Sequence, residues 1–284
     1  GGDAAVIRIH GQNKGIAITV DSSAHYCLAD PTIGAKQVVS EAWRNLISVG
    51  SKPIAITNCL NFGNPEKENI MGQFVESIDG ISQACNYLDF PVVSGNVSFY
   101  NETKNRSIPP TPTIGGVGLI RNVSDMITNS IKKINSDVIV IGKTLGHLYQ
   151  SEFFREVVGI NNGPPPEINL FNEKNNGLAI YSMISKKIIN SAHDISSGGM
   201  LLALTEMCIS GNIGAKIKIP ENNVGIHGYL FGEDQSRYLI EVDKKNTDQA
   251  IMILKKNAIY YEIIGETQKD NLTIGKEFSV KLSE

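Results

Sequence analysis

Two polar stretches hold the residue types in this chain that could do chemistry. They cover residues 57–67 and 94–101 and are rich in amides, hydroxyls and glycines, among them Asn58, Gly95 and Asn96. Glycine lets backbone N–H groups approach a phosphate closely, and an amide offers both hydrogen-bond donors and acceptors. The pattern therefore predicts a site for a polar ligand that carries phosphate.

Short apolar runs must position these two stretches. Residues 53–56 and 91–93 are predicted to form buried strands, and a polar stretch follows each of them. We therefore expect the site at two neighbouring chain reversals. Between them, a helix that begins near Pro65 carries one apolar stripe, made of Met71, Phe74, Val75, Ile78, Ile81, Cys85 and Leu88.

The first part of the chain alternates strands and helices around this pair. Residues 5–10 and 16–21 predict a hairpin. A helix follows, with Asp30 as its N-cap, Pro31 at its first position and Gly50 at its end. The glycines of a later strand, residues 113–120, have no helix after them, so close packing explains them better than a dinucleotide motif does.

The second part begins after a polar linker at residues 121–136. Its expected strands and helices come in mixed order, which favours an α+β fold over a strictly alternating parallel sheet. We predict two domains, 1–122 and 123–284. The expected strands of the second are 137–142, 188–192, 215–219, 238–242, 260–264 and 272–274, and its helices are 166–186, 197–210 and 246–257.

Composition narrows the class of protein. The chain has 284 residues, more than one core usually holds, and a net charge of −3, which favours neither nucleic acid nor a membrane surface as partner. No apolar run approaches the roughly 20 residues of a membrane-spanning helix. The four cysteines form no CxxC pair, so we expect free thiols in a reducing cytoplasm.

Three other clusters each allow a functional and a structural interpretation. Residues 193–199 could hold an anion at a helix N-terminus, but Asp194 or Ser196 capping that helix is the preferred interpretation. Residues 231–237 could face a ligand, yet a solvated turn before a strand is favoured.

Asp21, His25 and Asp30 could together hold Mg²⁺, since hard oxygens suit that ion. Their spacing does not match a ligand set, so capping and loop solvation are preferred.

The two polar stretches also carry a resemblance to a known family. Residues 58–67 and 95–102, together with Asp30-Pro31, His193-Asp194 and Phe231-Gly232, resemble the second half of formylglycinamidine ribonucleotide synthase. The match is to the ATP-dependent subunit of the small bacterial type and covers essentially the whole chain. It implies the two-domain fold of the aminoimidazole ribonucleotide synthetases, in which the N-terminal domain pairs through its sheet with a like domain.

The resemblance also implies roles for four residues. Asn58 and Gly95 would contact ATP, Asn96 would be a Mg²⁺ ligand, and Ser98 would contact the substrate. Some family members carry Asp where this chain has Asn58, and the amide lacks the negative charge of that carboxylate. No catalytic residue is assigned to this half, because the family's acid–base histidine belongs to the first half.

The implied reaction is the ATP-dependent conversion of formylglycinamide ribonucleotide to the amidine in purine biosynthesis. ATP would phosphorylate the amide oxygen, and ammonia would then displace the phosphate. The implied partners are the upstream half of the same synthase, a glutaminase subunit that supplies ammonia and a small bridging subunit. A second, structural nucleotide site of the family would lie near Asp21, Asp30 and Asp194, without assigned residues.

Two alternatives remain open. The chain could be a non-catalytic nucleotide-binding and dimerisation module, able to homodimerise, or a small-molecule kinase of the same fold. The isolated chain is expected to be inactive as a ligase, because the first half supplies most of the active site.

Overall fold

The computed structural model describes residues 2–104, 106–220 and 224–283. The first part of the chain forms a five-stranded sheet with the order β1-β2-β7-β3-β4, in which only β3 and β4 are parallel neighbours. Its strands are β1 (Ala5–Arg8), β2 (Gly15–Asp21), β7 (Thr111–Ile120), β3 (Lys52–Asn61) and β4 (Val92–Ser98). A two-stranded hairpin, β5 (Glu102–Thr103) and β6 (Arg106–Ser107), follows β4.

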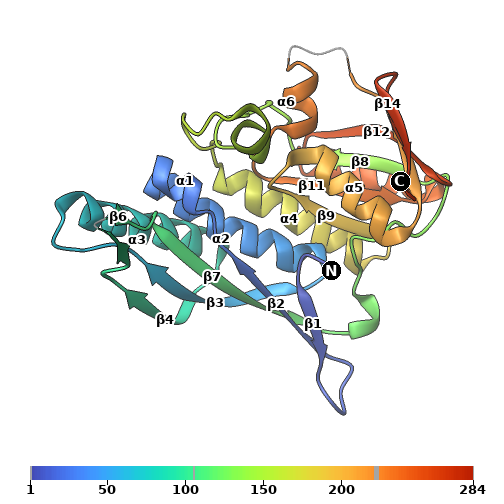
Figure 1. Cartoon of the computed structure of the whole chain (residues 1–284). Helices are drawn as coiled ribbons and strands as arrows, with labels where there is room; N and C mark the ends of the chain where they lie inside the picture. Colours follow the sequence, from blue (N-terminus) through green and yellow to red (C-terminus); the bar gives the residue numbers. More distant parts are fainter. Residues whose placement is uncertain (1, 105, 221–223, 284) are drawn as a thin grey trace.

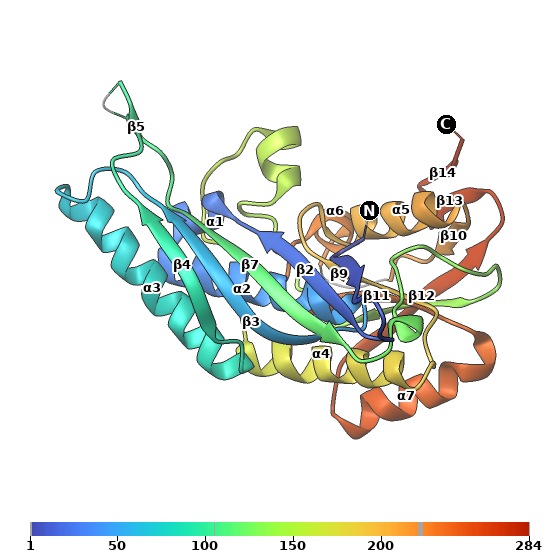
Figure 2. The same ribbon diagram turned by 90° about the horizontal axis from the view of Figure 1, so that it is seen from below.

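Three helices accompany this sheet. They are α1 (Ala24–Ala29), α2 (Pro31–Ser48) and α3 (Glu68–Leu88). The predicted N-cap of α2 is confirmed, because the Ile33 N–H donates to Asp30 Oδ1 at 2.8 Å. Figure 2 shows α2 and α3 together behind one face of the sheet, with the other face left open.

The second part forms a seven-stranded mixed sheet with the order β14-β13-β10-β12-β8-β11-β9. The α+β class is confirmed. The strands are β8 (Asp137–Ile141), β9 (Ser191–Ile195), β10 (Gly214–Ile217), β11 (Arg237–Val242), β12 (Tyr261–Gln268), β13 (Asn271–Ile274) and β14 (Phe278–Lys281). The helices are α4 (Leu170–Ser185), α5 (Gly199–Gly211), α6 (Ile226–Phe231) and α7 (Thr247–Lys256), with short turns η1 (Val123–Asp125), η2 (Phe153–Val158) and η3 (Lys244–Asn246).

Alternating residues of β8 divide the core of the second part. Ile139 and Ile141 belong to a large core that continues into α2 and the first sheet, whereas Val138 and Val140 pack on the side of α5 and α6. The two sheets are therefore joined through shared helices (Figure 1). Each sheet draws its strands from one side of residue 122, the predicted domain boundary, which stays a prediction.

Helix α2 is buried on almost every side. Besides its apolar stripe it carries a polar stripe at three- and four-residue steps that is fully buried: Gln37, Ser40, Arg44 and Ser48. This second stripe faces the second part of the chain. Helix α4 crosses α2 closely, because a Cβ atom on Gly177 would collide with the ring of Trp43.

Several boundaries differ from those predicted. Strand β3 continues to Asn61 and β4 to Ser98, so the four predicted site residues lie within paired strands and not at chain reversals. Pairing to neighbours on the sheet outweighs the weak β-propensity of their amides and glycines. Strand β9 begins three residues later than expected, and the six-residue helix α1 was not predicted.

The cysteines and the apolar character of the helices were both considered from composition. None of the four cysteines, all of which lie among the described residues, forms a disulfide bond. Among the described residues, no helix combines the length and the apolar character needed to cross a membrane.

Candidate ligand site at the edge of the first sheet

The four predicted site residues sit at neighbouring positions of β3 and β4. Asn58 lies opposite Gly95, Cys59 opposite Asn96, and Asn61 opposite Ser98. Side chains alternate between the faces of a sheet, so these three pairs do not all point the same way.

Asn58 points to the helix-covered face. It pairs with the buried Ile114 on β7 and lines a groove that runs beneath α3 beside Ile81 and Cys85. Its carboxamide fills the space that a side chain on Gly95 would need, since the Cβ of any other residue there would collide with Asn58 Oδ1. The Asn58 side chain would therefore have to move before a larger residue could replace Gly95.

The backbone of Gly95 faces the free edge of the sheet. The Phe62 N–H donates to the Ser98 carbonyl at 2.9 Å, so Ser98 bonds to β3. Residues of a parallel strand alternate between their two neighbours, which turns the Gly95 N–H and C=O away from β3. Strand β4 is the last of the sheet, and these groups are therefore open to a ligand.

Asn96 and Ser98 point to the open face. Cys59 and Asn61 share that face, together with Thr113 of β7. The prediction that Asn96 and Ser98 lie on the same side of the chain is consistent with this alternation. Within the described residues nothing hydrogen-bonds to the Asn96 carboxamide, which is exposed.

The four residues are therefore neighbours, yet they do not converge on one face. A ligand that touches all of them must wrap around the edge formed by β4. The sequence correctly predicted that the four residues are neighbours. It did not reveal that Asn58 lies on the helix-covered face while Asn96 and Ser98 lie on the open face.

A carboxylate ties the two polar stretches together beyond the strands. Glu102 Oε1 accepts from Lys67 Nζ at 2.7 Å, from Ser107 Oγ at 2.7 Å and from the Asn64 N–H at 3.2 Å. The hydrogen bonds from Lys67 and Ser107 lower the pKa of Glu102 to about 2. The segment after β3 is thereby fixed against the segment after β4.

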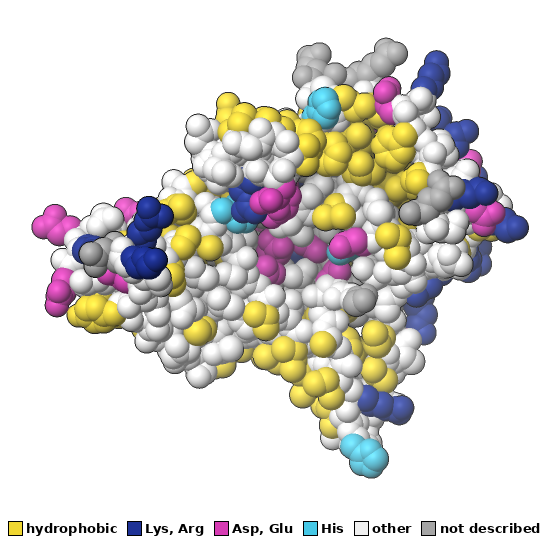
Figure 3. Space-filling view, viewed as in Figure 1, with side chains coloured by type: hydrophobic (Ala, Val, Ile, Leu, Met, Phe, Trp, Pro, Cys, Tyr) yellow, Lys and Arg dark blue, Asp and Glu magenta, His cyan; other side chains and the backbone are white. Residues whose placement is uncertain are grey.

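A second polar cluster lies between the two sheets, where acidic side chains gather in a hollow of the surface (Figure 3). Its centre is Arg44, whose Nη1 lies 2.8 Å from Glu173 Oε1. The Nε of Arg44 lies 3.7 Å from Asp194 Oδ2, and its Nη2 lies 3.8 Å from Glu41 Oε2. Burial raises the pKa of Glu41 to about 7, with the Asp194 charge adding to it. Burial works against the charge of Arg44, but Glu173, Glu41 and Asp194 together raise its pKa.

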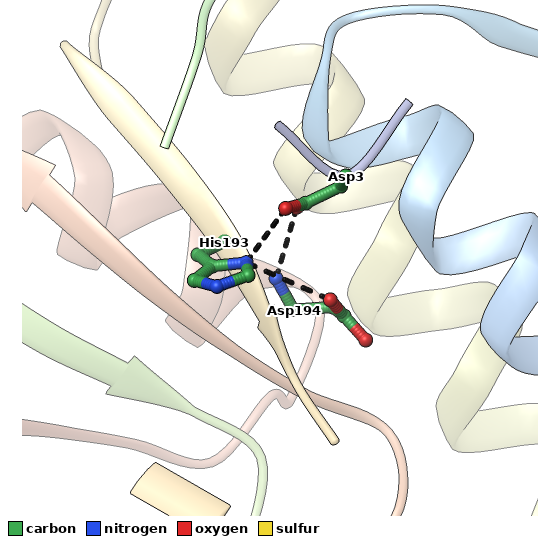
Figure 4. Close-up of side chains that lie close together, drawn as sticks. All are labelled: Asp3, His193 and Asp194. Atoms are coloured by element: carbon green, nitrogen blue, oxygen red, sulfur yellow. Dashed lines mark hydrogen bonds and ion pairs between the residues drawn. The ribbon is translucent and has the colours of Figure 1, made fainter. Parts of the chain in front are cut away.

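His193 links this cluster to the N-terminal segment (Figure 4). Its Nδ1 lies 2.7 Å from Asp3 Oδ1, and its Nε2 lies 2.8 Å from Glu206 Oε2. Asp3, His193 and Asp194 offer ligand atoms within 4.8 Å of one another, a spacing that suits a metal ion. Both ring nitrogens already face a carboxylate, however, so the arrangement fits a protonated imidazolium better than a metal ligand.

This geometry corrects the preferred interpretation of residues 193–199. His193 and Asp194 lie within β9, and Gly198, not Asp194 or Ser196, is the N-cap of α5. Burial, followed by the Asp3 charge, raises the pKa of Asp194 to about 6.

The solvated turn expected at residues 231–237 is also wrong. Residues 233–237 are all buried. Glu233 Oε1 accepts from the Glu152 and Gly198 N–H groups, and Asp234 accepts from three consecutive N–H groups at residues 145–147. These carboxylates replace water as hydrogen-bond acceptors for the backbone N–H groups of the loops. The sequence alone does not show these contacts.

Capping, one part of the preferred interpretation of Asp21, His25 and Asp30, is confirmed for Asp30, but loop solvation does not describe Asp21, which lies at the end of β2. Asp30 caps α2, and Asp21 Oδ2 accepts from Asn45 Nδ2 at 2.8 Å. Burial, followed by the Arg155 charge, lowers the pKa of His25 to about 4, so its ring is neutral at pH 7.

Known families match nearly the whole of this chain. The model described as AIR synthase related protein, N-terminal domain, matches residues 1–120, and the corresponding C-terminal domain model matches residues 135–276. The chain belongs to the AIR synthase related proteins. The expected family and fold are thereby confirmed.

Two curated relatives of this AIR synthase related protein match it over nearly all of its length. Phosphoribosylformylglycinamidine synthase subunit PurL of Pelagibacter ubique (strain HTCC1062) is 55% identical over 284 residues, which are 100% of this chain and 39% of the relative. The subunit of the same name from Rhodopseudomonas palustris (strain BisB5) is 46% identical over 282 residues, 99% of this chain and 38% of the relative. The chain therefore spans about two fifths of the length of these relatives.

Solved structures agree on the fold of the AIR synthase related proteins. The structure described as T. maritima PurL complexed with FGAR aligns with a TM-score of 0.83 at 18% identity, covering 99% of this chain and 47% of that one. T. maritima PurL complexed with ATP gives 0.80 at 17% identity, with 99% and 45% covered. AaThiL complexed with AMPPCP and TMP gives 0.69 at 18% identity, with 99% and 89% covered.

Proposed function

We propose that this chain is the second half of the ATP-dependent subunit of phosphoribosylformylglycinamidine synthase. The observation that carries the proposal is the 55% identity to the P. ubique subunit over all 284 residues, which includes both strands of the edge site. The activity is that of an ATP-dependent carbon–nitrogen ligase, which makes the amidine from formylglycinamide ribonucleotide and ammonia. The chain supplies part of the ATP site, and the upstream half supplies the rest.

Each edge residue has a role that its geometry supports. The outward N–H and C=O of Gly95 can bond to ATP along the free edge. Asn58 supports that edge from beneath, because its carboxamide packs against Gly95. On this geometry its contact with ATP would come from the α3 side of the strand. Ser98, on the open face, contacts the substrate.

Magnesium fits the donor set only in part. The exposed Asn96 carboxamide offers one hard, neutral oxygen, and Mg²⁺ in phosphate-transfer sites commonly keeps waters and phosphate oxygens as its other ligands. When bound, the ion would neutralise charge on the transferring phosphoryl group. The role of Asn96 is to fix one ligand position at the edge of the sheet, while β3 holds its strand in place.

The open face of the first sheet supports pairing with a like domain. Four exposed apolar residues lie there on adjacent strands: Ile7, Ile18, Val20 and Val117. An apolar face of this kind indicates a protein interface. In the whole synthase the upstream half would cover it, and in the isolated chain a second copy could do so.

The remaining partners follow from the same assignment. The glutaminase subunit and the small bridging subunit would deliver ammonia, and the complex would work in the cytoplasm.

A chimaera tests this function directly. The matched 284 residues of the P. ubique subunit are replaced with this chain, and amidine formation is measured with ammonium chloride as nitrogen source. The proposal predicts ATP-dependent product from the chimaera and none from this chain alone. A folded chimaera without turnover would contradict the proposal, and phosphorylation of thiamine monophosphate by the isolated chain would favour the kinase alternative.

A further inference from the structure

Asn101 lies directly behind Ser98, where the chain leaves β4. Its Nδ2 donates to the Ser98 carbonyl at 2.9 Å and to the Phe62 carbonyl at 3.0 Å. These two carbonyls accept both hydrogens of the amide group, which fixes the orientation of the carboxamide. The Asn101 backbone N–H also donates to Phe62, at 3.2 Å, and holds the residue in place.

The fixed carboxamide directs the Ser98 hydroxyl. Asn101 Oδ1 lies 3.3 Å from Ser98 Oγ and can only accept a hydrogen bond. Nδ2 also donates to the same oxygen at 3.1 Å, sharing its hydrogens with the two carbonyls, so the carboxamide both donates to and accepts from this hydroxyl. The hydroxyl hydrogen therefore points to Asn101, and Ser98 Oγ presents only lone pairs to the open face.

A hydroxyl whose hydrogen is already bound has a restricted choice of ligand. It can accept from a hydroxyl or an amide N–H, but it cannot donate to a phosphate oxygen. The same site without Asn101 would let the hydroxyl rotate and bond to either kind of group.

We propose that Asn101 is a positioning residue for Ser98 and that Ser98 therefore recognises a hydrogen-bond donor of the substrate, a ribose hydroxyl or the amide N–H, and not its phosphate. The inference rests on the proposed function, which assigns Ser98 to the substrate. It deepens that assignment by naming the chemical group that Ser98 binds.

Steady-state kinetics of the chimaeric synthase test the role of Asn101. Asn101→Ala and Ser98→Ala should each raise the KM for formylglycinamide ribonucleotide about tenfold, with the KM for ATP nearly unchanged. The double variant should be no worse than Ser98→Ala, since Asn101 acts only through that hydroxyl. Losses that multiply in the double variant, or an equal rise in the KM for ATP, would overturn the inference.

Glu102→Gln controls for loosening of the segment. Glu102 braces the same region through Lys67 but does not touch Ser98. We expect this variant to lower the melting temperature without the substrate-specific rise in KM. The same selective rise in Glu102→Gln would show that general loosening explains the effect of Asn101→Ala, and the inference would fail.

Substrate analogues test the ligand class without any change at Asn101. Analogues lacking the 2′-hydroxyl, the 3′-hydroxyl or the amide N–H are compared on the unmodified and the Ser98→Ala chimaera. With the unmodified chimaera, one analogue should have a kcat/KM about tenfold below that of the natural substrate. With the Ser98→Ala chimaera, the same analogue and the natural substrate should have similar kcat/KM values. If only removal of the phosphate shows this dependence on Ser98, the inference that Ser98 binds a hydrogen-bond donor of the substrate is overturned. An unchanged KM in Ser98→Ala would instead refute the earlier assignment of Ser98 to the substrate.

Discussion

Asn58 and Gly95 face each other across the only parallel strand pair of the first sheet, and the Asn58 carboxamide occupies the place of a Gly95 side chain. The two polar stretches therefore contact each other directly, through the Asn58 carboxamide and the Gly95 backbone. It also leaves the Gly95 backbone free at the edge of the sheet, where a nucleotide can reach it.

Gly95→Ala should destabilise this chain by about 1–3 kcal/mol, because the new methyl group collides with Asn58 Oδ1 and the adjacent backbone. Urea unfolding measures the loss. Gly72→Ala in α3 is the matched control, since nothing lies within 4 Å of its added methyl group. Adding Asn58→Ala should recover part of the stability, and a Gly95→Ala chain as stable as the parent would contradict the packing described.

Arg44→Met should cost about 3–5 kcal/mol at pH 8, because it leaves Glu173, Glu41 and Asp194 buried without their cation. The deficit should shrink toward pH 5, where Glu41 and Asp194 take up protons. Unfolding at both pH values distinguishes this effect from lost packing, which would give the same deficit at each.

Glu41→Gln should have the opposite effect. The pKa of Glu41 in the fold is about 7, against the ordinary value of 4.5, so ionising it costs stability that builds up as the pH rises between these values. At pH 8 the variant should be more stable than the parent by roughly 3 kcal/mol, and the difference should nearly vanish at pH 4.5. A variant less stable at pH 8 would show that the Arg44 pairing outweighs burial.

His193→Gln should weaken the chain most at low pH. Burial opposes the charge of His193, but Asp3 and Glu206 raise its pKa well above 6.5. Its contribution to stability is therefore complete below the unfolded pKa and is lost as the pH rises through the folded one. Melting temperatures at pH 6 and pH 9 check this, with the exposed His10→Gln as control, and a deficit that grows with pH would refute it.

Local chemistry made some elements predictable. Asp30-Pro31 marks the start of α2 because the carboxylate accepts from Ile33 N and proline fits the first turn. The glycines of β7 were correctly interpreted as packing residues, since a Cβ on Gly116 or Gly118 would press on neighbouring strands or helices.

Other features of the fold depend on contacts between residues far apart in the sequence and could not be predicted from local patterns. Residues 58–61 and 94–98 have the composition of turns, and only their register with each other and with β7 makes them strands. Arg44 lies on a helix whose apolar face was evident, but its acidic partners come from residues far along the chain, such as Glu173 and Asp194. The polar stripe on α2, repeating every three or four residues, was the one signal that could have indicated a second buried face.

The magnesium dependence of turnover tests the central claim most directly, because Asn96 is the residue through which this half would reach the metal. In the chimaeric synthase, Asn96→Ala should raise the Mg²⁺ concentration for half-maximal rate and lower kcat by roughly a hundredfold. Asn257→Ala, at the exposed end of α7, should leave both unchanged. If Asn96→Ala turns over normally with an unaltered Mg²⁺ requirement, this strand edge does not take part in the ATP site and the account is wrong.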